Sequence, residues 1–103
     1  MLRPKERHEA SLPSARKIRR SCSTELYRTI KRMKLYIPDE LLKQGEELYV
    51  KKVFGNLTWI HENSQNRKRL ADWWDEAVSE ELSQLWKVDR TKLSACFRDA
   101  FGG

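Results

Sequence analysis

Hydrophobic residues recur at helical spacing in four stretches of the chain. In the first stretch, over residues 24–37, apolar positions fall at i, i+4, i+7 and i+11, which places them on one face of a helix. These positions are Leu26, Ile30, Met33 and Ile37. Pro38 ends this predicted helix, because the residue before a proline disfavours the α region.

A second helix is predicted over residues 39–55. Pro38 suits a first helical turn, and Asp39 and Glu40 favour the positive end of the helix dipole. Its apolar face carries Leu41, Leu42, Leu48, Tyr49 and Val53, and Gly45 on that face would permit a close contact with another helix. Gly55 and Asn56 form a stop signal. For the apolar segment 57–60 that follows, the sequence leaves a kinked helix and a folded-back connector equally open.

The longest periodic run predicts a third helix over residues 64–86, with N-cap candidates in 63–66. Its apolar positions are Leu70, Trp73, Trp74, Ala77, Val78, Leu82 and Leu85. Asp89 is positioned to cap a short fourth helix that starts at about residue 90. The predicted fold class is therefore all-α, a small antiparallel three-helix bundle with a short C-terminal fourth helix.

Charge divides the 103-residue chain unevenly. The formal net charge is +6, and residues 1–20 contain seven Lys or Arg against Glu6 and Glu9. We expect a flexible basic N-terminal arm over residues 1–20 and one helical domain over residues 21–103. The Arg and Ser content of the arm is typical of a mitochondrial import signal, whereas its two glutamates are not, and a solvated tail is an equal alternative.

Motifs for catalysis are missing from the sequence, so we expect a protein that is not an enzyme. It has no Gly-rich phosphate loop, and His8 and His61 are isolated. Cys22 and Cys96 have neither zinc spacing nor a Cys-x-x-Cys arrangement, so we expect free thiols, no metal and no cofactor of its own. No apolar run approaches the roughly 20 residues of a membrane span.

A basic run from Arg16 to Lys34 is the clearest candidate for binding. It holds eight Lys or Arg and one acid, Glu25. Such a face suits the phosphate backbone of RNA, and it equally suits an acidic protein helix. Composition does not separate these two partners.

Four segments together resemble the LYR-motif (complex 1 LYR-like) family, most closely its succinate dehydrogenase assembly factor 3 branch. Leu26-Tyr27-Arg28 gives the family tripeptide, and the resemblance extends over roughly residues 24–80. The other matching segments are Ile37-Pro38-Asp39-Glu40-Leu41-Leu42-Lys43-Gln44-Gly45-Glu46, Tyr49-Val50-Lys51-Lys52-Val53-Phe54 and Leu70-Ala71-Asp72-Trp73-Trp74-Asp75.

The resemblance implies a non-enzymatic adaptor in the mitochondrial matrix or on the matrix side of the inner membrane. Such an adaptor would be an assembly factor or accessory subunit of a respiratory or other large mitochondrial complex. It would bind acyl carrier protein, whose phosphopantetheine-linked acyl chain would enter between the helices. The implied partner-binding residues are Leu26, Tyr27, Arg28, Lys31 and Arg32. The implied acyl-chain contacts are Tyr27, Met33, Leu48 and Phe54.

One departure from the family pattern follows Phe54. Family members usually continue with an arginine and a further base, whereas this chain has Gly55 and Asn56. Part of the basic cluster that would bind the carrier is therefore missing. Two alternatives stay open: a basic helical module that binds RNA or the mitochondrial ribosome, and a structural subunit that has kept the fold and lost the carrier.

Overall fold

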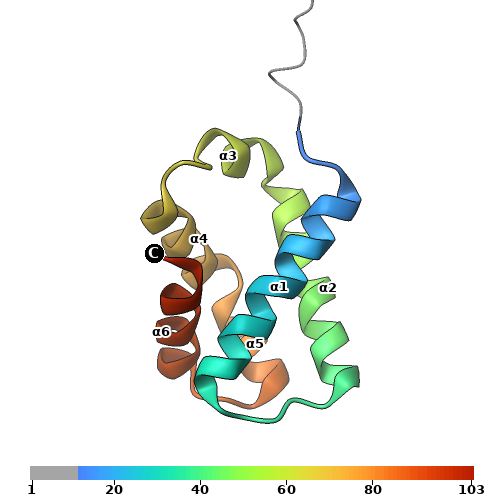
Figure 1. Ribbon diagram of the computed structural model, residues 1–103, viewed down its shortest axis with the longest axis vertical. Helices are drawn as coiled ribbons and strands as arrows, with labels where there is room; N and C mark the ends of the chain where they lie inside the picture. The colour runs from blue at the N-terminus through green and yellow to red at the C-terminus, as the bar shows by residue number, and fades with distance from the viewer. Residues whose placement is uncertain (1–11) are drawn as a thin grey trace, which may run out of the picture.

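All the regular structure in the computed structural model, which describes residues 12–103, is α-helical (Figure 1). The helices are α1 (Ala15–Met33), α2 (Asp39–Gly55), α3 (Leu57–Glu62), α4 (Arg67–Ala77), α5 (Ser79–Trp86) and α6 (Arg90–Phe101). The prediction of an all-α bundle is confirmed.

Helix α1 starts earlier and ends earlier than the predicted 24–37. The Ser14 side chain caps its first turn by accepting a hydrogen bond from the Lys17 backbone N–H. Because Ile18 is buried in the core, the helical domain begins at Ala15 and not at residue 21. The part of the predicted arm over residues 1–11 lies outside the described residues. At the other end, Lys34 adopts a left-handed conformation (φ 57°), and the chain leaves the helix before it reaches Pro38.

Helix α2 runs antiparallel to α1 after a short connection, and its bounds match the predicted 39–55 (Figure 1). The segment for which the sequence left two alternatives forms the separate short helix α3. This helix crosses one end of the bundle between α2 and α4 (Figure 1).

The predicted single helix 64–86 is two helices that meet at Val78. Asn66 caps α4 by accepting from the Arg69 backbone N–H, as the sequence suggested for this region. At the junction, the Asp75 carbonyl accepts hydrogen bonds from the Ser79 hydroxyl (2.6 Å) and from the Arg90 guanidinium (3.0 Å). Side chains thus occupy a carbonyl that a continuous helix would use for its own backbone bond. The periodicity of the apolar residues continues across this break, so the sequence did not reveal it.

Helix α6 is more than a short appendage, because it packs along α1. Its N-cap is Asp89, which accepts from the Lys92 backbone N–H as predicted. Arg32 of α1 forms an ion pair with Asp99 (2.6 Å), and Arg98 bonds Asp72 and Asp75 of α4. These contacts hold α6 between α1 and α4.

The core is built around stacked aromatic rings. Trp74 lies parallel to Phe97 with ring centroids 3.8 Å apart, and Tyr49 meets both rings edge-on. Leu26, Val78, Leu82 and Leu93 are fully buried around them. None of the helices within residues 12–103 has the length and apolar character needed to cross a membrane.

Candidate interaction surface on helix α1

The Leu26-Tyr27-Arg28 tripeptide divides between the core and the surface. Leu26 has no exposed area, whereas the Tyr27 side chain is 58% exposed and Arg28 is exposed. Successive residues of a helix point about 100° apart, so one apolar residue can anchor the helix while its neighbours face outward. Leu26 therefore supports this surface from within, and Tyr27 and Arg28 are available to a partner.

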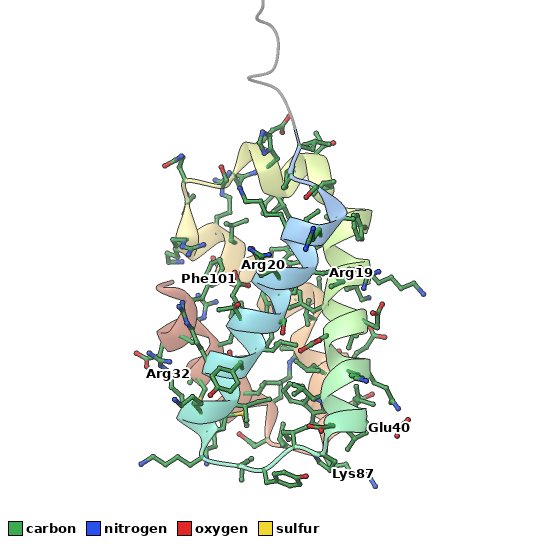
Figure 2. The ribbon with its side chains drawn as sticks, turned by 45° about the vertical axis from the view of Figure 1, so that its right-hand side comes forward. Arg19, Arg20, Arg32, Glu40, Lys87 and Phe101 are labelled. Atoms are coloured by element: carbon green, nitrogen blue, oxygen red, sulfur yellow. The ribbon has the colours of Figure 1, made fainter. Side chains whose placement is uncertain are left out.

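Lys31 extends the exposed surface, and Arg32 is partly committed to the fold. The Lys31 ammonium lies 5.5 Å from the centre of the Tyr27 ring, within the range of a cation–π contact one helical turn apart. Arg32 points to the α6 side, where it pairs with Asp99 (Figure 2). We define the interaction surface as Tyr27, Arg28 and Lys31.

The four residues implied as acyl-chain contacts are not brought together. Met33 is buried at the end of α1 next to the connection, and Leu48 is half-buried on α2. Phe54 is 41% exposed and lies 15 residues after Asp39, which is about 22 Å along α2 at 1.5 Å per residue. Since α2 runs antiparallel to α1, Met33 and Phe54 lie near opposite ends of the bundle. A single channel lined by all four is not present.

A cavity of about 510 Å³ lies elsewhere, near the end of the bundle that α3 crosses. It is open to solvent on one side and is lined by residues of the first half of α1, the second half of α2, α3 and α4, and by Phe101. Its apolar lining includes Ile18, Val53, Leu57, Ile60, Leu70 and Trp73, and none of Tyr27, Met33, Leu48 and Phe54 takes part. Sequence reasoning missed this cavity, because helical periodicity does not show which faces of different helices leave a space between them.

The two adjacent tryptophans of α4 lie in different environments. Trp74 is fully buried, whereas Trp73 is half-buried at the wall of the cavity. Among the other tryptophans, Trp86 is buried in the core and Trp59 on α3 is 37% exposed. The pair therefore supplies one core ring and one ring at an accessible edge.

Three polar side chains, Cys22, Glu25 and Tyr49, lie together in the lining of this cavity. The Tyr49 hydroxyl donates a hydrogen bond to the Glu25 carboxylate. Burial raises the pKa of the Cys22 thiol to about 12, and the negative charge of Glu25 adds to this effect. Burial also raises the pKa of Glu25, although the Tyr49 hydrogen bond and the charges of Arg67 and Arg28 oppose the rise.

The raised pKa values keep the Cys22 thiol and the Tyr49 phenol protonated near neutral pH. A thiol with a pKa of about 12 holds almost no nucleophilic thiolate near neutral pH. Burial, and next the charge of Glu25, raise the pKa of Tyr49 well above its ordinary value, which keeps its proton on the phenol. Cys22 and Cys96 are both free thiols, as the sequence predicted.

Comparison with known proteins adds no relative, since no family model, no curated protein and no solved structure matches the chain.

Proposed function

We propose that this protein is a non-enzymatic adaptor of the LYR type that binds an acidic surface of a partner protein through Tyr27, Arg28 and Lys31. The observation that carries the proposal is the exposure of these three neighbouring side chains on a helix whose Leu26 is locked in the core. An exposed aromatic ring flanked by an arginine and a lysine has the composition of a binding hot spot.

The partner we propose is acyl carrier protein, in the setting of an assembly factor or accessory subunit of a large complex in the mitochondrial matrix. This identification is supported by the resemblance of residues 24–80 to the LYR-motif family and by the positive charge of the α1 surface. Electrostatic complementarity with an acidic helix would accelerate association and fix its orientation. Because Met33 and Phe54 lie near opposite ends of the bundle, the proposal assigns binding to this surface and not to a channel that contains both residues.

The experiment compares two double variants that change charge equally. Arg28→Glu with Lys31→Glu reverses the surface, and Lys43→Glu with Lys92→Glu reverses two exposed lysines outside it, on α2 and α6. We expect the first pair to weaken capture of acyl carrier protein at least tenfold and the second to change it little, with unaltered helicity in both. Equal loss in the two variants would show a non-specific charge effect, and no binding by the wild type would refute the carrier as partner.

Measuring RNA binding by the same variants tests the second class of partner. If the α1 face binds phosphate backbones, the Arg28→Glu, Lys31→Glu variant should lose affinity for an unrelated RNA, the Lys43→Glu, Lys92→Glu variant should keep it, and affinity should fall steeply with salt. Tight RNA binding by the wild type, without carrier binding, would replace the adaptor proposal with that of a nucleic-acid module.

A further inference from the structure

A second pocket of about 250 Å³ adjoins the large cavity on the side of α6. Arg20 and Arg28 of α1 and Arg67 of α4 line it, together with the hydroxyl-bearing Ser21 and Thr24. Arg20 faces the side of α1 on which α6 ends at Phe101, whereas its neighbour Arg19 turns to the α2 side and pairs with Glu47 (Figure 2). Three arginines from two helices therefore line one hollow.

These three arginines differ from others in the described part of the chain. Arg19, Arg32, Arg90 and Arg98 each form an ion pair with a carboxylate. Among residues 12–103, no carboxylate pairs with Arg20, Arg28 or Arg67. Against these three positive charges, the described lining of the pocket holds one acid, Glu25, so the net charge still favours an anion that enters the pocket.

The two pockets share part of their lining. Ser21, Glu25, Arg67 and Phe101 belong to both, and the Arg67 guanidinium lies 4.0 Å from the centre of the Phe101 ring. That contact fixes the arginine at the boundary between an apolar space and a basic one. Glu25 is the one carboxylate among the described lining residues, and the Tyr49 hydroxyl already engages it.

We propose that these two pockets form one binding site for a single-chain lipid phosphate, with the alkyl chain in the larger pocket and the phosphate between Arg20, Arg28 and Arg67. A phosphate suits this position because its terminal oxygens can accept hydrogen bonds from several guanidinium forks at once.

The size of the larger pocket suits one alkyl chain. A volume of about 510 Å³ falls within the ~300–1,000 Å³ of ligand pockets. At about 30 Å³ per heavy atom, the share of one molecule in liquid water, it has room for about 17 heavy atoms. That is one alkyl chain of ordinary length and not two.

This site does not rest on the adaptor function, and it needs no carrier protein. Arg28 belongs to both surfaces, so the test uses Arg67 and Ile60, which lie outside the Tyr27, Arg28 and Lys31 surface. Failure of lipid binding would therefore leave the carrier experiment intact, and the reverse also holds.

The test is calorimetric titration of the whole protein with dodecyl phosphate below its micelle-forming concentration, with dodecanol and inorganic phosphate as the two partial ligands. We expect dodecyl phosphate to bind about tenfold or more tightly than either partial ligand. Equal affinity of dodecanol would refute the phosphate position, equal affinity of inorganic phosphate would refute the chain position, and no binding would overturn the site.

Substitutions test the phosphate position and the chain position of the site separately. Arg67→Gln should lower the affinity for dodecyl phosphate about tenfold and leave dodecanol unaffected. Arg69→Gln, two residues away on α4 and outside both pockets, is the matched control and should change neither. Ile60→Trp should fill the cavity and weaken both chain-bearing ligands. Equal behaviour of the Arg67 and Arg69 variants would overturn the proposal, whether or not the Ile60 variant folds.

Discussion

The indole ring of Trp86 lies directly against Gly45. A methyl group on Gly45 would come within 2.6 Å of Cζ2 and 2.9 Å of Cε2 of that ring. The ring cannot easily move away, because its N–H donates to the Leu41 carbonyl (2.9 Å). The close helix contact that the sequence predicted at Gly45 is thus confirmed, with α5 as the neighbouring helix.

Gly45→Ala should therefore lower the free energy of unfolding by about 1–3 kcal/mol, since the added methyl overpacks a fixed contact. Gly55→Ala is the matched control within the same helix, because a methyl group there meets nothing within 4 Å. The control should be neutral or stabilising by up to about 1 kcal/mol. Urea titration of both variants measures the difference, and equal midpoints would contradict the steric explanation.

Trp74→Ala should cost about 3–5 kcal/mol, because it removes a fully buried ring and its stacking on Phe97. Phe54→Ala should cost far less, about 1 kcal/mol, since 41% of that side chain is already exposed. Small domains have only about 5–15 kcal/mol of total stability, so the Trp74 variant should approach unfolding. Circular dichroism during denaturation measures the unfolding free energy of both variants. A larger loss of stability in the Phe54 variant would contradict the assignment of Trp74 to the core.

Glu25→Gln should change how stability depends on pH. The pKa of Glu25 is raised in the folded protein, so the folded state binds more protons than the unfolded chain above about pH 4. Its contribution to stability is therefore fully present below that pH and is lost as pH rises through the folded-state pKa. The glutamine variant has no proton to lose, so its stability relative to wild type should rise between pH 4 and pH 7.

Urea unfolding at three pH values measures this trend. Glu76→Gln removes an exposed carboxylate on α4 and serves as the comparison for a surface charge. If the difference between the Glu25 variant and wild type stayed constant from pH 4 to pH 7, the carboxyl would not be perturbed by burial.

The two cysteines should react at very different rates in the folded protein. With a pKa of about 12, about one Cys22 thiol in 10,000 is ionised at pH 8, and the side chain is 3% exposed. Cys96 is partly exposed. Iodoacetamide followed by mass spectrometry should label Cys96 first, and Cys22 only after unfolding in urea. Equal labelling of both in the native state would show that the α1–α2 contact opens readily.

Local sequence signals located several helix boundaries accurately. The Pro38-Asp39-Glu40 start, the Gly55-Asn56 stop and the Asp89 cap each depend on groups within one helical turn. Such signals act through backbone hydrogen bonds between near neighbours, so they can be read without knowledge of the fold. The break at Val78 could not be read this way, because Arg90, far along the chain, occupies the Asp75 carbonyl.

The candidate sites also combine features that the sequence predicts with features that only helix packing decides. The sequence by itself determined that α1 has a basic surface and that Leu26 lies on its apolar face, because helical periodicity fixes which side chains share a face. Only the tertiary structure decided that Met33 and Phe54 lie far apart and that Arg32 is bound to Asp99. It also brought Arg67 to Arg20 and Arg28, from helices separated by more than thirty residues. The physical reason is that periodicity orients a side chain around its own helix, whereas the packing of helices against one another decides which faces meet and where space between them remains.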